Sequence, residues 1–132
     1  MTRKPIVRLS GFIVGLIALF TIAACESGGG GAKAQIPSIM SPSGMSNTSA
    51  AAKNNEGVDH LVQGHWDVAI KHLNEAIAAK PDFAEAHFNL AIAMDGKGKH
   101  AEASDSFKKA QEFGADNPKI TGSEILKKHL NM

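Results

Sequence analysis

Residues 64–79 read GHWDVAIKHLNEAIAA, and residues 98–113 read GKHAEASDSFKKAQEF. The two stretches align at a spacing of 34 residues, and a glycine, two alanines and one large apolar residue recur in register. These pairs are Gly64 and Gly98, Ala69 and Ala103, Leu73 and Phe107, and Ala76 and Ala110. A fixed period of this length is typical of arrays of helical repeats. The sequence therefore predicts an all-α fold.

The recurring residues form one stripe along a helix. Ala69, Leu73 and Ala76 are spaced at i, i+4 and i+7, which places them on a single helical face. Alanine at two of the three positions lets a neighbouring helix approach closely, and the larger residue fills the remaining gap. Gly64 and Gly98 stand just before the helices, where a tight turn needs a residue that tolerates positive φ. We expect helices over residues 50–62, 66–79, 82–96 and 100–113, with short connections that suit antiparallel neighbours.

The pattern resembles the tetratricopeptide repeat, a helix-turn-helix unit of 34 residues, over about residues 50–117. Besides the stripe, the similarity rests on small residues at Gly57 and Ala91, on Trp66 after the first turn and on Pro81 at the end of the first unit. It implies two repeats in a short right-handed α-solenoid, over about 50–83 and 84–117. His60 and His87 stand where the family usually has aromatic or large apolar residues, so we expect both to substitute for core residues.

A further helix is expected over about residues 118–131. Thr121 and Glu124 are spaced as a capping box, which marks a helix start. Ile125, Leu126 and Leu130 give this helix an apolar edge that suits the cover of a terminal repeat face. Two repeats are fewer than the three that such stacks usually need. The capping helix adds stability, and a homodimer that stacks repeats end to end would add more.

Residues 1–24 have the layout of a secretory signal, with a basic start followed by an apolar run and small residues. The tetrapeptide at the end of this segment, Ile22-Ala23-Ala24-Cys25, resembles a bacterial lipobox, in which the cysteine is acylated and becomes the new N-terminus. A cysteine with two or three acyl chains anchors a protein stably in a membrane. The resemblance, with Glu26 rather than Asp after the cysteine, leads us to expect a periplasm-facing protein of a Gram-negative outer membrane.

The linker, residues 25–49, contains four consecutive glycines, Gly28–Gly31, and many serines without helical periodicity. Such a composition is typical of disordered segments. We therefore expect a flexible tether between the anchor and the helical domain of residues 50–132. Four apolar residues interrupt it, and we expect them to be solvated rather than docked on the domain: Ile36, Ile39, Met40 and Met45.

Charge and spacing argue against several functions. From Cys25 onward the chain carries 11 lysines and 13 acidic residues, a net charge of −2, so nucleic-acid binding is not expected. Cys25 is the only cysteine, which excludes an internal disulfide. The six histidines include no pair at i, i+4 and no His-Glu-x-x-His motif, and no serine has the context of a catalytic nucleophile. We expect no metal, no cofactor and no catalytic residue.

The family resemblance implies a concave groove lined by the first helix of each repeat. The residues assigned to this partner-binding groove are Asn54, Val58, Leu61, Glu85, Phe88, Asn89 and Ile92. Phe88 and Ile92 would expose an apolar strip there, unless the capping helix or the tether covers them. Asn54 and Val58 replace the lysine and asparagine of the family's clamp for a C-terminal carboxylate, so a partner would bind by apolar contact and by asparagine hydrogen bonds to its backbone.

These features predict a non-enzymatic, membrane-anchored scaffold that docks a peptide or helix of a cell-envelope protein. A narrower alternative is an assembly factor, similar to a pilotin, for an outer-membrane secretion or pilus machine. A metal-dependent enzyme that uses the histidines is the remaining alternative.

Overall fold

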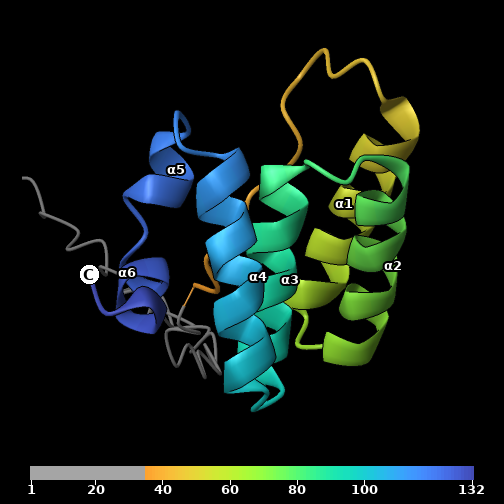
Figure 1. Ribbon diagram of the computed structural model, residues 1–132. Helices are drawn as coiled ribbons and strands as arrows, with labels where there is room; N and C mark the ends of the chain where they lie inside the picture. The colour runs from red at the N-terminus through yellow and green to blue at the C-terminus, as the bar shows by residue number, and fades with distance from the viewer. Residues whose placement is uncertain (1–34) are drawn as a thin grey trace, which may run out of the picture. The chain divides into compact units, whose positions relative to one another are not determined.

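The computed structural model describes residues 35–132, and these residues form six α-helices and no strand (Figure 1). The helices are α1 (Thr48–Val62), α2 (Trp66–Ala79), α3 (Ala84–Gly96), α4 (His100–Phe113), α5 (Pro118–Thr121) and α6 (Glu124–Leu130). The predicted all-α fold is confirmed. The expected signal segment and Cys25 lie outside the described residues.

The first four helices form two antiparallel hairpins, α1–α2 and α3–α4, stacked side by side (Figure 1). α3 is the shared element of this stack, because it contacts α1 and α2 of the first hairpin as well as its own partner α4. All residues from Ala86 to Ala93 are consequently buried. The core of the domain runs along α3.

The small-residue stripes lie where the sequence places them. Ala69, Leu73 and Ala76 of α2 have no exposed surface, and the same holds for the equivalent residues of α4. Gly64 and Gly98 adopt φ values of 77° and 81° in the turns before these helices, a conformation that favours glycine.

Gly57 determines how closely the helices of the first hairpin approach. A Cβ atom at this position would lie only 2.7 Å from Leu73 Cγ, so the missing side chain leaves the space that Leu73 fills. The equivalent residue of the second repeat, Ala91, is fully buried. Each repeat therefore pairs a small residue on its first helix with a large one on its second.

The first helix begins at Thr48, two residues before the expected start, because Asn47 caps it. The Asn47 Oδ1 atom accepts a hydrogen bond from the backbone N–H of Ala50 at 3.0 Å, and its Nδ2 atom donates to the Ala79 carbonyl at 2.9 Å. Asparagine is among the preferred N-cap residues. The start of α1 is thus tied to the end of α2.

The expected capping helix is divided into α5 and α6. Asn117 starts α5, since its Oδ1 atom accepts from the backbone N–H of Lys119 and Pro118 occupies the first turn. The predicted capping box is wrong. The Thr121 hydroxyl donates to the Asn117 carbonyl inside α5, and Glu124 pairs with Lys127.

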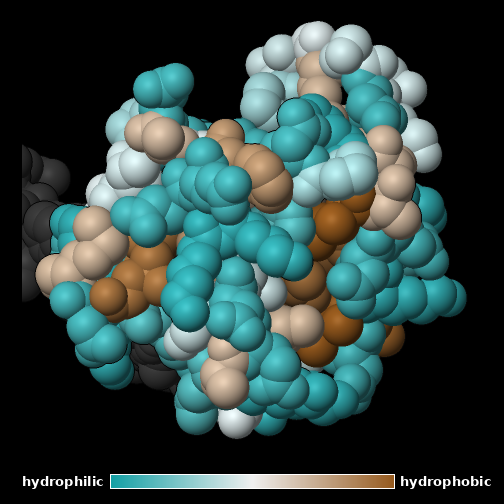
Figure 2. Space-filling model, viewed as in Figure 1, coloured by the Kyte–Doolittle hydropathy of each residue, from teal (hydrophilic) through white to brown (hydrophobic). Residues whose placement is uncertain are grey.

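The cover itself is present. Ile120 of α5 and Leu126 of α6 are fully buried in the same core cluster as Phe107 of α4. On the face drawn in Figure 2, apolar surface appears in the furrow between α2 and α4 and where α6 meets α4, while hydrophilic residues cover most of the remainder.

His87 occupies a core position, as the sequence predicts. The residue is buried, its Nε2 atom lies 2.8 Å from the Pro81 carbonyl, and its ring packs against Phe113 at 5.5 Å. Burial lowers the pKa of the imidazole below its ordinary value of 6.5, although the bond to Pro81 opposes this shift. His60, by contrast, is half-buried and stacks on His72, with ring centroids 5.5 Å apart.

We expect Gly57→Ala to destabilise the domain by about 1–3 kcal/mol, because the new methyl group overlaps Leu73. Replacing a helical glycine by alanine at an unobstructed site has the opposite effect, by up to about 1 kcal/mol. Urea unfolding followed by circular dichroism measures the change. In a Leu73→Ala background the overlap is absent, so the same substitution should become neutral or stabilising; an equal loss in both backgrounds would contradict the packing described.

Candidate functional site

The side of the stack that is formed by α1 and α3 carries a row of asparagines. α1 contributes Asn54 and Asn55, and α3 contributes Asn89. The side chains of Asn54 and Asn89 are fully buried, and the Asn89 Nδ2 atom donates to Asn54 Oδ1 at 2.8 Å. This contact joins the two repeats across the floor of the groove.

The groove is occupied by the chain's own residues 35–41. The side chain of Ile39 is buried with 6% of its surface exposed, and it belongs to the main core cluster together with Phe88 and Ile92. The Asn89 carboxamide pairs with the backbone of Ile39 on both sides. Its Oδ1 atom accepts from Ile39 N at 2.8 Å, and its Nδ2 atom donates to Ile39 O at 2.7 Å.

A second set of hydrogen bonds holds Ser41. Its backbone N–H donates to Asn55 Oδ1 at 2.9 Å, and its hydroxyl donates to the Ala51 carbonyl at 3.0 Å. Asn54 Nδ2 adds bonds to Ile39 O at 3.2 Å and to the Ser41 hydroxyl at 3.1 Å. Asn55 and Asn89 are 34 residues apart in the sequence, and they accept from two residues that are two apart in the segment.

The expectation that the apolar linker residues are solvated is wrong for Ile39, which is buried, and also for Ile36 and Met45, which are half-buried against apolar clusters of the domain. Burial of one isoleucine side chain stabilises by about 1.5–3 kcal/mol. The asparagines satisfy the backbone groups that burial would otherwise leave unpaired. Met40 points outward with 50% of its surface exposed, in agreement with the expectation.

The assigned groove residues divide into two groups. Asn54, Phe88, Asn89 and Ile92 lie under the docked segment or beside it, and all four are buried. The strip of Phe88 and Ile92 is therefore covered rather than exposed. The other three serve the fold, since Val58 and Leu61 are buried and Glu85 accepts a hydrogen bond from Asn117 Nδ2 at 2.9 Å.

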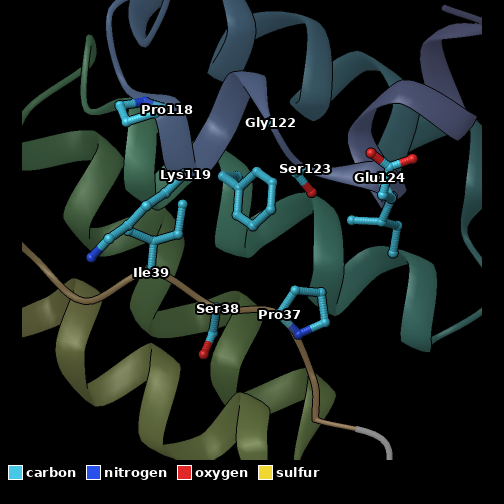
Figure 3. Close-up of a pocket in the computed structure, with 10 residues that line it drawn as sticks. Pro37, Ser38, Ile39, Pro118, Lys119, Gly122, Ser123 and Glu124 are labelled. Atoms are coloured by element: carbon cyan, nitrogen blue, oxygen red, sulfur yellow. The ribbon is translucent and has the colours of Figure 1, made fainter.

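A hollow of about 480 Å³ remains beside the docked segment. Figure 3 shows it between residues 37–39 on one side and α5 with the start of α6 on the other. Phe88 lines the hollow, and its ring meets that of Phe107 edge-on, with the ring centroids 5.6 Å apart. Polar groups of Lys119, Ser123 and Glu124 line the rim.

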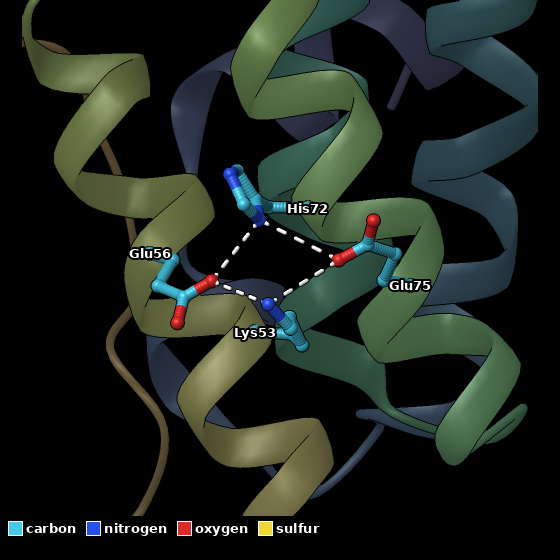
Figure 4. Close-up of polar contacts among 4 residues, drawn as sticks. All are labelled: Lys53, Glu56, His72 and Glu75. Atoms are coloured by element: carbon cyan, nitrogen blue, oxygen red, sulfur yellow. Dashed lines mark hydrogen bonds and ion pairs between the residues drawn. The ribbon is translucent and has the colours of Figure 1, made fainter.

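A charged cluster lies on the outer face of the first hairpin (Figure 4). Lys53 Nζ contacts Glu56 at 2.8 Å and Glu75 at 3.4 Å, and His72 Nδ1 lies 3.1 Å from the same Glu56 oxygen. The hydrogen bond to Glu56 raises the pKa of Lys53, and in turn it lowers the pKa of Glu56. These groups link α1 to α2 at an exposed surface, where such pairs contribute little to stability.

Three groups with metal-binding chemistry meet near α6, which the sequence spacing did not predict. His100 Nδ1 and His129 Nε2 both contact Asp95 Oδ1, at 2.7 and 3.0 Å, and Ser104 Oγ lies 3.2 Å from His129 Nδ1. Two imidazoles and a carboxylate are a set that zinc uses. However, Lys128 lines the same hollow, and its positive charge opposes a cation. Hydrogen bonds to one carboxylate oxygen account for the arrangement, which fastens α6 to α3 and α4.

The asparagine carboxamides of the groove are suited to hydrogen bonding with a peptide backbone. Carboxamides do not ionise and are poor nucleophiles, whereas each one offers an acceptor and two donors in a plane. That arrangement matches the N–H and C=O of one residue in an extended chain. The groove therefore binds backbone, with an apolar socket for one side chain.

Comparison with known proteins supports the tetratricopeptide repeat in this region. The tetratricopeptide repeat family model matches residues 54–118. Tetratricopeptide repeat protein 6 of Homo sapiens is similar, with 34% identity over 70 residues that cover 53% of this chain but only 14% of that protein. No solved structure matches. Domains of this family are generally non-enzymatic scaffolds that bind protein partners.

None of the helices between residues 35 and 132 combines the length and the apolar character needed to cross a bilayer.

We expect Asn89→Ala to release the docked segment, because it leaves the buried N–H of Ile39 without a partner and leaves the Ile39 carbonyl with only the longer bond from Asn54 Nδ2. A lost buried hydrogen bond of this kind costs about 1–3 kcal/mol. Amide hydrogen exchange at Ile39 should accelerate by tenfold or more, while exchange at Leu73 in the core should change far less. Unchanged protection at Ile39 would show that Asn89 does not hold the segment.

Proposed function

We propose that this protein is a membrane-anchored scaffold that binds an extended segment of another protein in the bacterial cell envelope. The observation that carries this proposal is the paired hydrogen bonding of Asn89 to the backbone of Ile39. These contacts are made to main-chain atoms and do not depend on which residue supplies them. The same carboxamide can therefore receive an extended segment from a partner.

The partner binds through three kinds of contact. Asn55 and Asn89 accept N–H groups two residues apart, the socket of Ile39 takes an aliphatic side chain, and the hollow over Phe88 receives further apolar groups. Hydrogen bonds to the main chain contribute affinity, and the pockets provide specificity. No step in this activity requires bond making or breaking, so the protein acts as an adaptor and not as an enzyme.

The anchor is acylated Cys25. The support comes from the sequence, in which an apolar run ends at Ile22-Ala23-Ala24-Cys25 and the helical domain follows after a glycine- and serine-rich stretch. Multiple acyl chains on one residue hold a protein stably at a membrane. We place the anchored protein on the periplasmic side of the outer membrane in a Gram-negative cell.

Metabolic labelling with a palmitate analogue tests the anchor. The wild-type protein should incorporate the label, whereas Cys25→Ala should not. Met40→Ala, a change of an exposed side chain, serves as the matched control and should behave as wild type. Equal labelling of the wild type and Cys25→Ala would reject acylation at this cysteine.

Photo-cross-linking in intact cells tests the use of the groove. A photoreactive amino acid at Lys119, on the rim of the hollow, should give a discrete adduct with an envelope protein. The same amino acid at Lys108, an exposed residue of α4 that does not line the hollow, should not. The absence of an adduct at Lys119, or the same adduct from both positions, would contradict a partner in the groove.

A further inference from the structure

We propose that residues 35–41 compete with an external partner for the groove. That partner is an extended segment of another protein, with an aliphatic residue in the place of Ile39. This inference rests on the proposed function, because it names the chemistry of the partner and how its access is controlled. The chain's own segment holds the site until such a partner displaces it.

The segment contacts the groove in the manner of a ligand. Two sets of hydrogen bonds hold it. The backbone N–H and C=O of Ile39 bond to the Asn89 side chain, and the backbone N–H of Ser41 donates to the Asn55 side chain. The single deeply buried side chain is that of Ile39, while Gln35, Pro37 and Met40 are exposed. Any extended chain with an aliphatic residue at the central position can repeat these contacts.

The segment can leave without unfolding the domain. The start of α1 is held separately, because Asn47 bonds to Ala50 and to the Ala79 carbonyl, and Met45 packs on the cluster around Phe83. A turn at residues 43–44 lies between that attachment and Ser41. Gly44 in this turn adopts φ 82°, and no other side chain or backbone atom lies within 4 Å of the position of its Cβ. The turn provides an open hinge.

The segment also fills the site incompletely. The hollow of about 480 Å³ beside residues 37–39 is bounded by Phe88, Lys119 and Ile125, and the docked chain forms only one of its walls. A partner that places an additional side chain there gains contacts that the intrachain segment does not make. This difference allows displacement even though the internal segment is covalently attached.

The covalent connection of residues 35–41 to the domain determines how strongly they compete with an external ligand. A segment joined by a short linker acts at an effective concentration in the millimolar range. The apparent affinity of an external ligand is reduced by the fraction of molecules whose groove is free. If the groove is free in about one molecule in ten, then vacating it should strengthen external binding by about tenfold.

The test uses a fluorescein-labelled peptide with the sequence of residues 35–42, QIPSIMSP, and the protein from Glu26 onward, which lacks the apolar run and the anchor but keeps every described residue. Ile39→Asp empties the groove, since a carboxylate cannot be buried in an apolar socket without large cost. Fluorescence anisotropy should show that this variant binds the peptide at least about tenfold more tightly than the parent. Met40→Asp, which changes an exposed neighbour, should match the parent.

Further arms make the result decisive. Adding Asn89→Ala to Ile39→Asp should abolish peptide binding, and circular dichroism should show that the helices persist in each variant. If Ile39→Asp unfolds, Ile39→Ala provides the same comparison with a milder change. The proposal would be overturned if the Ile39→Asp variant bound the peptide no more tightly than the parent protein does. A parent protein that sediments as a dimer and becomes monomeric on Ile39→Asp would also overturn it, because the segment would then occupy the groove of a second copy.

The outcomes separate this inference from the proposed function. An adduct at Lys119 in cells, together with no gain in peptide binding by Ile39→Asp, would retain the scaffold and reject the competitor. A gain in peptide binding without any adduct at Lys119 would retain the competitor and reject the envelope partner.

Discussion

The close approach of helices through small side chains underlies every other feature of this domain. Gly57 leaves room for Leu73, and the alanine stripes of α2 and α4 have no exposed surface. This packing brings α1 near enough to α3 for Asn54 and Asn89 to bond at 2.8 Å. A bulkier interface would separate the asparagines, and the groove would lose the continuous row of amide groups that binds an extended chain.

The need to pair buried polar groups explains why residues 35–41, a short segment without secondary structure, are held against the row of asparagines. Burial of Ile39 brings its own N–H and C=O out of water, and Asn89 replaces both lost interactions. Conversely, Asn54 and Asn89 would be buried beside apolar residues with fewer partners if the segment were absent. Groove and segment satisfy one another, which is why the site is described equally well as a binding site and as part of the fold.

The sequence predicted the parts of the fold that depend on local patterns. The bounds of α2 and α4 follow directly from the alanine stripes and the glycines before them. The cap was less predictable, because the start signal at Asn117-Pro118 and the interruption at Gly122 compete with the apparent capping box at Thr121. Local patterns favoured one helix, whereas hydrogen bonding produced two.

The site was predicted only in part. Asn89 was assigned to the groove from the family resemblance, but its bond to Ile39 spans 50 residues and involves backbone atoms of the segment. Such a contact leaves no signature in the sequence, because the backbone groups that it uses are the same in every residue of the segment. The cluster of Asp95, His100 and His129 was missed for a related reason, because its third member is on α6 and reaches the others only through tertiary packing.

The docked segment also limits how far the helical domain can lie from Cys25. Ten steps along the chain lead from Cys25 to Gln35, and a chain of that length spans at most roughly 36 Å. Undocking moves the first fixed point to Met45, and the limit for the 20 steps from Cys25 rises to roughly 72 Å. If Cys25 carries the proposed acyl anchor, a ligand that takes the groove would therefore also double the distance from the bilayer that the domain can reach.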